Sequence, residues 1–179
     1  MRIKFLLPGV TMILLVVAQS ASPSCQVSTP ILGAFLVPAT PTAPLGQSFL
    51  ACNDGIVTNV AVDIGPATAT QVTLGLGPGT DVLSPTYQLT QPFPAGSRIR
   101  YVTSFPVVAG QRYALSLTPN QGVLYLSQLS GTAYSDGTEI AVENGVAVEK
   151  NSDIVFSVTI DAPVPAGAVT WGTLKSMYR

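Results

Sequence analysis

The sequence predicts an all-β protein, an antiparallel β-sandwich of the jelly-roll type with about eight or nine strands in residues 46–162. Three observations predict this fold class. Apolar and polar residues alternate in short runs, which is the period of a half-buried strand. Sixteen Gly and fifteen Pro break the chain often. Helix-period stretches are absent through residue 162, so the crossover helices that a parallel sheet needs are missing.

The run 56–64 shows the alternation first, with Ile56, Val60 and Ile64 on one face and Asp63 on the other. Turn signals separate such runs, and Asn144-Gly145 is a strong hairpin turn because both residues tolerate a positive φ. Tyr, Leu and Ile of one parity are expected in the core. The further runs that predict strands are 72–76, 99–103, 113–117 and 154–160.

Residues 1–20 are predicted to be a secretory signal peptide, with basic Arg2 and Lys4, an apolar segment 5–17 and small residues before the cleavage point. The apolar segment is short for a membrane span of about 20 residues. An uncleaved N-terminal anchor is the alternative. We therefore expect a secreted, extracellular or cell-surface protein, or a periplasmic one, with no membrane span in the mature chain.

Residues 21–45 are rich in proline and are expected to form an extended lead-in that allows one strand at 31–37. The chain has two cysteines, Cys25 and Cys52. In an exported protein an even count predicts a disulfide. Lipidation of Cys25 is the alternative, although the residues before it lack the leucine that such signals normally carry.

Charged residues make up 9% of the chain, against a typical ~25%. Without Arg2 and Lys4, six basic residues remain against nine acidic ones, a net charge of −3. No basic patch is visible, so nucleic acid is excluded as an expected partner.

The chain contains no histidine, which excludes Ser-His-Asp and Cys-His nucleophile systems. A pair of carboxylates is the remaining route to catalysis. The candidates are Glu139, Glu143, Glu149 and Asp153, and Glu139 and Glu143 have the same strand parity. We interpret these residues as solvated charges at a sheet edge, so the sequence predicts that the protein is not an enzyme.

Calcium is the one cofactor that the sequence allows, because Asp and Asn oxygens suffice to bind it. The candidate ligands are Asn53, Asp54 and Asp136. Asx turns explain the same residues without a metal.

Candidate ligand-binding residues lie in a loop and on outward strand positions. Tyr134, beside the turn at Asp136, is the best aromatic candidate, and Asp136 accompanies it. Arg112 has outward parity next to Ala114 and Ser116, and Arg98 and Arg100 share outward parity on the neighbouring run of the sequence.

Residues 163–179 are expected to form a linker and a short amphipathic C-terminal tail, with Trp171, Leu174 and Tyr178 at helical spacing. So short a helix is marginal in isolation. Docking on a partner, packing back on the sandwich, and a frayed tail without a role remain open.

Five segments resemble a β-sandwich module of secreted bacterial proteins that is similar to galactose-binding-like and carbohydrate-binding jelly rolls. They are GQSFLA (46–51), IVTNVAVDIG (56–65), FPVVAGQRYALSL (105–117), GTAYSDGTEI (131–140) and DIVFSVTI (153–160). The resemblance implies a non-catalytic accessory or surface module and carries over no catalytic residue. We therefore expect a module that binds carbohydrate or another cell-surface polymer. The alternative is a self-associating structural subunit of an extracellular matrix, envelope or filament.

Overall fold

The computed structural model describes residues 24–30, 35–94, 96–131 and 133–163. The predicted signal peptide (1–20) and the tail residues Trp171, Leu174 and Tyr178 lie outside the described residues, as does the helix expected there. The described residues form strands, turns and bends but no helix, and so they contain no helix that could cross a membrane.

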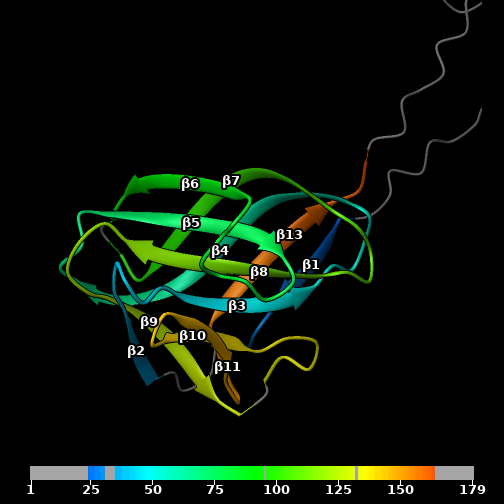
Figure 1. The fold of residues 1–179 in the computed structure, drawn as a ribbon. Helices are drawn as coiled ribbons and strands as arrows, with labels where there is room; N and C mark the ends of the chain where they lie inside the picture. Colours follow the sequence, from blue (N-terminus) through cyan, green and yellow to red (C-terminus); the bar gives the residue numbers. More distant parts are fainter. Residues whose placement is uncertain (1–23, 31–34, 95, 132, 164–179) are drawn as a thin grey trace, which may run out of the picture.

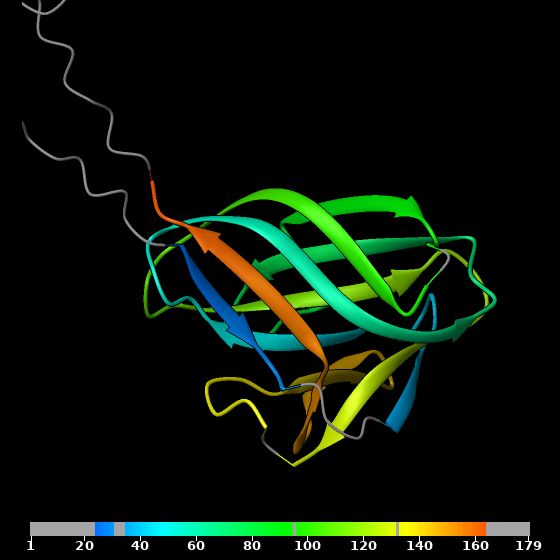
Figure 2. The same ribbon diagram turned by 180° about the vertical axis from the view of Figure 1, so that it is seen from behind.

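The described residues fold into a β-sandwich of two antiparallel sheets, one of seven strands and one of six. In Figure 1 the six-stranded sheet faces the viewer, and Figure 2 shows the seven-stranded sheet from behind. The strands are β1 (Cys25–Ser28), β2 (Phe35–Ala39), β3 (Leu45–Leu50), β4 (Gly55–Ala67), β5 (Gln71–Pro78), β6 (Tyr87–Pro92), β7 (Arg98–Val107), β8 (Arg112–Pro119), β9 (Leu124–Ser130), β10 (Glu139–Glu143), β11 (Val146–Glu149), β12 (Ser152–Ile154) and β13 (Phe156–Asp161).

The six-stranded sheet has the order β11-β10-β3-β8-β5-β6. The seven-stranded sheet has the path β1-β13-β4-β9-β12, with β7 paired to β4 and β2 paired to β9. The long strand β4 pairs with β13 and β7 over its first part and with β9 over its last part. Most of these partners are distant in sequence, so long-range pairing rather than local hairpins assembles the surfaces described below.

More strands form than the eight or nine expected. β1 and β2 lie in the proline-rich segment and pair with β13 and β9, so the sandwich begins before residue 46, the boundary that we expected. The run 154–160, which we expected to form one strand, contributes to two strands, β12 and β13, which are separated only at Val155. Short edge strands carry too few residues for an alternating pattern to be visible in the sequence. Pairing with the strand beside them fixes their positions instead.

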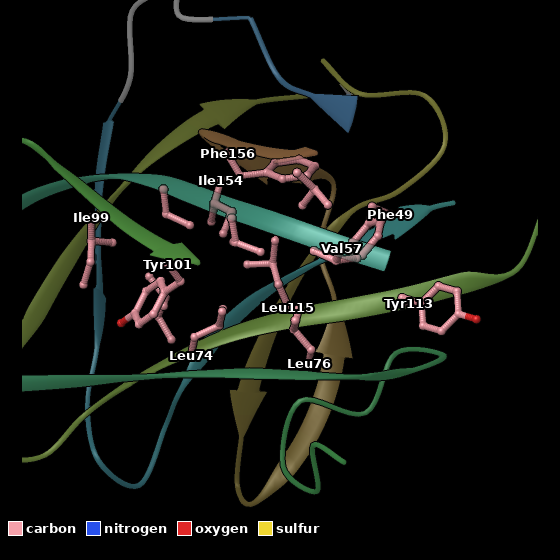
Figure 3. Packing of buried hydrophobic residues seen from close by; sticks show 14 of the residues in the cluster. Phe49, Val57, Leu74, Leu76, Ile99, Tyr101, Tyr113, Leu115, Ile154 and Phe156 are labelled. Carbon is pink, nitrogen blue, oxygen red and sulfur yellow. The ribbon is translucent and has the colours of Figure 1, made fainter. Parts of the chain in front are cut away.

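The apolar core lies between the sheets, and alternation predicts it well (Figure 3). Tyr101, Leu115 and Leu117 are fully buried, as their parity indicates. Burying a side chain of this size stabilises the fold by roughly 1.5–3 kcal/mol. The Tyr101 hydroxyl donates to the carbonyl of Val72 over 3.0 Å, so the buried polar atom of this core tyrosine is satisfied.

A chain of aromatic rings crosses the core and joins the two sheets. The Phe105 ring of β7 packs edge-on against the Tyr113 ring of β8, with 5.7 Å between ring centroids. Tyr113 also contacts Phe49, and Phe105 contacts Tyr87, each with centroids 6.1 Å apart. Such pairs contribute about 0.5–1.5 kcal/mol beyond the area that they bury.

The predicted disulfide joins Cys25 and Cys52 across 27 residues of sequence. It connects the first residue of the edge strand β1 to the turn that precedes β4. Both cysteines are thus bridged, so the structure favours the disulfide over lipidation of Cys25.

Candidate functional site

The outer face of the six-stranded sheet carries a hollow of about 280 Å³. Its floor is formed by β5, β6 and β8, and its two walls are formed by loops. One wall is the turn at residues 40–44, and the other is the loop 79–86 between β5 and β6. The lining residues are Pro41, Thr42, Pro44, Thr73, Gly75, Val82, Leu83, Pro85, Gln88, Ser116 and Thr118.

Strand register builds the floor of the hollow. Gly75 of β5 lies opposite Ser116 of β8 on one side and Gln88 of β6 on the other. Thr73 of β5 likewise lies opposite Thr118 of β8. Gly75 is required at the centre, because a Cβ atom there would lie 2.5 Å from Ser116 Oγ and 2.8 Å from Pro85 Cγ.

The loop 79–86 is held on the sheet by a small apolar cluster of its own. Val82 is 3% exposed and packs with Ala114 of β8 and Ile140 of β10. The Asp81 carboxylate accepts hydrogen bonds from the backbone amides of Leu83 and Ser84 over 2.8 and 3.2 Å. These contacts fix the wall of the hollow, and the loop explains why Ser116, a residue of outward parity, is nevertheless buried.

The polar groups of the hollow are neutral. Thr73 shares a hydrogen bond of 2.7 Å with the hydroxyl of Thr90. Within the part of the chain that the structure describes, the side chains of Thr42, Gln88 and Thr118 form no hydrogen bond, so they are available to a ligand. Hydroxyls and a carboxamide can each donate and accept, which suits a ligand rich in hydroxyl groups.

A second, shallower hollow of about 610 Å³ lies at one end of the sandwich. Ile64, Pro66, Phe93 and Pro94 dominate its lining. It offers few polar groups to fix the orientation of a ligand, so we give the first hollow priority.

The structure brings three of the predicted ligand-binding residues into one region. Tyr134 lies close enough to Asp136 and Arg112 to interact with them electrostatically, although burial is the main cause that raises the pKa of Tyr134. Asp136 and Arg112 are exposed. Arg112 Nη1 lies 3.6 Å from Glu149 Oε1, so a solvated ion pair already engages it.

Tyr134 is directed into the protein rather than toward a ligand. Its hydroxyl accepts a hydrogen bond of 3.0 Å from the backbone amide of Leu50. Its ring packs edge-on against Phe156 with centroids 5.7 Å apart. The loop position thus serves to close the sandwich, and a ligand would have to break these contacts to use the ring.

Arg98 and Arg100 lie on β7, in the opposite sheet from Arg112, so the structure does not bring the three arginines onto one face. Sequence parity gives the face of a strand but not the sheet that contains it. Arg98 Nε lies 3.3 Å from Asp63 Oδ1, and its Nη2 donates to Ser157 Oγ over 2.9 Å. Arg100 is exposed.

The candidate calcium ligands have structural partners. Asp54 Oδ1 accepts a hydrogen bond of 2.8 Å from the amide of Ala109, which is distant in sequence, so this contact is not an Asx turn. Asn53 also makes a contact. Among the described residues, no three His, Cys, Asp or Glu side chains are grouped closely enough to hold a metal ion. The structure therefore does not assemble Asn53, Asp54 and Asp136 with a further acidic ligand.

Two of the four carboxylates interpreted as solvated edge charges are buried, and this interpretation is wrong for them. Glu139 is 2% exposed and Asp153 is fully buried, whereas Glu143 and Glu149 are exposed. Glu139 Oε2 accepts hydrogen bonds from Ser152 Oγ over 2.9 Å and from the Gln128 amide. Parity puts Glu139 and Glu143 on the same face of β10, but the seven-stranded sheet covers only the end of β10 that holds Glu139.

The residues of the hollow were not found from the sequence. They come from three strands and two loops, and most of them are common Thr, Ser, Gln or Pro residues. A possible signal was the two glycines of β5, Gly75 and Gly77, which weaken a strand interior and mark the close approach of other chain segments. Only the strand register shows that the approaching segment is the loop 79–86.

Comparison with known proteins gives a fold likeness only. No protein-family model matches the sequence, and no curated protein matches it either. The solved structure of a clostridial cysteine protease, Cwp84, after propeptide cleavage is similar, with a TM-score of 0.57 over 78% of this chain at 8% sequence identity. The chain covers 40% of that protease chain. At this identity the likeness concerns the fold alone.

Proposed function

We propose that the protein is an exported, non-catalytic module that binds carbohydrate or another hydroxyl-rich surface polymer. The observation that carries this proposal is the hollow on the outer face of the six-stranded sheet, where neutral hydroxyl and amide side chains line a space of about 280 Å³. Sugars present hydroxyl groups that such side chains can bind in either sense, as donor or acceptor.

Two features of the chain support a role without catalysis. The sequence has no histidine, and both cysteines are bridged. The buried carboxylates Glu139 and Asp153 are held by hydrogen bonds inside the sandwich and do not line the hollow. The disulfide also supports export, because disulfides persist in oxidising compartments.

The experiment that tests this proposal measures binding of the exported, purified chain to an array of glycans and to insoluble cell-wall polysaccharides. We expect retention that soluble oligosaccharide of the same kind competes away. The proposal fails if no carbohydrate retains the chain and no sugar raises its melting temperature.

A second candidate function, self-association as a structural subunit, is favoured by the edge of the seven-stranded sheet. The edge strand β2 pairs only with β9 among the described strands. Phe35 and Leu36 of β2 are 64% and 52% exposed, and Tyr125 of β9 is 37% exposed. An apolar edge without charged residues is a template for pairing with another chain.

Sedimentation of the purified chain over a range of concentrations separates the two functions. A structural subunit forms assemblies that Leu36→Lys disperses. The matched control is Val102→Lys, which changes an 80% exposed valine of β7. A chain that stays monomeric at all concentrations excludes self-association through this edge.

A further inference from the structure

We infer that the hollow binds a single uncharged sugar unit and discriminates against acidic sugars. This inference rests on the proposed function and specifies the ligand class of the same site. It follows from three properties of the hollow, namely the charge of its lining, its size and the spacing of its free polar groups.

Among the described residues, those that line the hollow include no charged residue. A sugar carboxylate that entered it would lose part of its hydration without gaining a cation, which is unfavourable. The loop 79–86 adds a negative charge beside the lining residues Val82 and Leu83, because Asp81 precedes them in sequence. The overall charge of the chain is also negative, so its field does not attract anions.

The size of the hollow fits one unit of a glycan. Its volume of about 280 Å³ lies just below the roughly 300 Å³ at which ligand pockets begin. Loops form two of its walls, and a space of this volume has room for one sugar unit rather than several. In the part of the chain that the structure describes, no aromatic residue lines the hollow. We therefore expect a dissociation constant of about 1 mM for one unit, with avidity supplied by repeated units.

The free polar groups lie on both sides of the central strand. Gln88 belongs to β6 and Thr118 to β8, and β5 runs between them. Neighbouring strands are about 4.8 Å apart, and the register offsets Gln88 and Thr118 by two residues along β5. The backbones of these two residues are therefore about 12 Å apart. This separation leaves room for one pyranose ring between the two side chains, with a hydrogen bond of about 2.8 Å on each side. Thr42 can contact the ring from the turn at residues 40–44.

The test is an NMR titration of the exported, isotope-labelled chain with methyl glycosides of neutral hexoses and with methyl glycosides of hexuronic acids. We expect the amide signals of Thr73, Gln88 and Thr118 to shift with neutral glycosides. We expect binding of the uronides to be at least about tenfold weaker, because their charge is not compensated.

Two variants and two matched controls identify the site. Gln88→Leu and Thr118→Val should each weaken binding of the neutral glycoside by about fivefold or more, since each removes one hydrogen bond to the ligand. Gln26→Leu and Thr159→Val make the same changes in strands of the opposite sheet and should leave binding unchanged. An unchanged melting temperature of each variant shows that it folds.

The outcomes separate this inference from the proposed function. If neutral glycosides shift amide signals elsewhere, for example near Tyr134 and Arg112, the hollow is not the binding site. The proposal that the protein binds carbohydrate then still stands. Uronides that bind as tightly as neutral glycosides overturn the selectivity. If no monomeric glycoside binds while the glycan array retains the chain, the single-unit mode is overturned and the function stands. If neither binds, both are overturned.

Discussion

The carboxylate of Asp153 in β12 accepts a hydrogen bond of 2.7 Å from the side-chain amide of Gln47 in β3, and both residues are fully buried. The contact joins the two sheets of the sandwich. Gln47 Oε1 accepts from the amide of Ile154 over 2.9 Å, and the other oxygen of Asp153 accepts from the amide of Tyr134 over 2.8 Å. A polar bridge therefore holds one end of an otherwise apolar core.

We predict that Gln47→Leu destabilises the fold strongly. Leucine leaves an oxygen of the buried Asp153 carboxylate and the amide of Ile154 without these partners, which costs about 3–5 kcal/mol. Urea unfolding followed by circular dichroism measures the free energy of unfolding. Gln26→Leu, at an exposed position of β1, is the control and should change it by less than about 0.5 kcal/mol.

Asp153→Asn refines this prediction. Asparagine keeps the shape of the side chain, but it loses the charge and replaces one of the two accepting oxygens with an amide nitrogen that cannot accept. We expect a smaller loss than for Gln47→Leu, about 1–3 kcal/mol, because hydrogen bonds to a charged group are worth about that much. A variant as stable as the wild type would show that the charge of Asp153 does not contribute to the bridge.

Much of this sandwich is visible in the sequence, because period 2 reports which side of a strand is buried. It places Leu115 and Leu117 in the core and gives Ser116 outward parity, as the structure shows. It does not report what covers the outer face. Ser116 is buried because the loop 79–86 lies over it, and that contact depends on pairing between strands that are distant in sequence.

The burial of Glu139 and the hollow were missed for the same reason. Glu139 and Glu143 have the same parity, but only Glu139 lies where β9 and β12 cover it. In the hollow, Gln88 and Ser116 come to lie on either side of Gly75 through the register of β6, β5 and β8. Parity is a local property of a strand, whereas sites on a sandwich depend on the order of the strands.

Removal of the disulfide should loosen the β1 edge. On the chain-entropy model, closing a loop of this length, with Cys25 and Cys52 separated by 27 residues, stabilises the fold by roughly 3–4 kcal/mol. We expect the double variant Cys25→Ser/Cys52→Ser to lose about that much stability in urea. Hydrogen exchange should rise first in β1, which among the described strands pairs only with β13. Equal exchange in all strands would contradict this order.

Stability should fall in alkaline solution because of Tyr101. Burial raises the pKa of Tyr101 above its usual value near 10. The folded state therefore keeps this proton at a pH where the unfolded chain releases it, and so the free energy of unfolding decreases as pH rises above about 10. Below that pH the contribution of Tyr101 is fully present.

The variant Tyr101→Phe tests this assignment. It loses the hydrogen bond to the carbonyl of Val72, so it should be about 1–2 kcal/mol less stable at neutral pH. Its urea midpoint should nevertheless fall less steeply with pH above 10 than that of the wild type. Parallel pH curves for the two proteins would assign the alkaline loss to other tyrosines, of which the partly buried Tyr134 is the first candidate.

Two glycines of the six-stranded sheet should respond in opposite ways to the same substitution. A Cβ atom on Gly46 of β3 would lie 2.4 Å from the carbonyl oxygen of Leu115 and 2.6 Å from Val82 Cγ1. The first of these is backbone in the paired strand and cannot move away without opening the ladder. On Gly77 of β5 the nearest atoms would lie 3.5 Å away, an ordinary contact.

We therefore expect Gly46→Ala to destabilise the fold by about 2–4 kcal/mol, because strand β3 and the loop 79–86 must both shift. Gly77→Ala should be neutral or stabilising by up to about 1 kcal/mol, since alanine restricts the unfolded chain and fits the folded one. Urea unfolding of the two variants side by side measures the difference. If the two variants lose a comparable free energy of unfolding, the close packing at Gly46 does not determine the destabilisation. A displaced loop in Gly46→Ala should also speed hydrogen exchange at the amides of Leu83 and Ser84, which Asp81 caps.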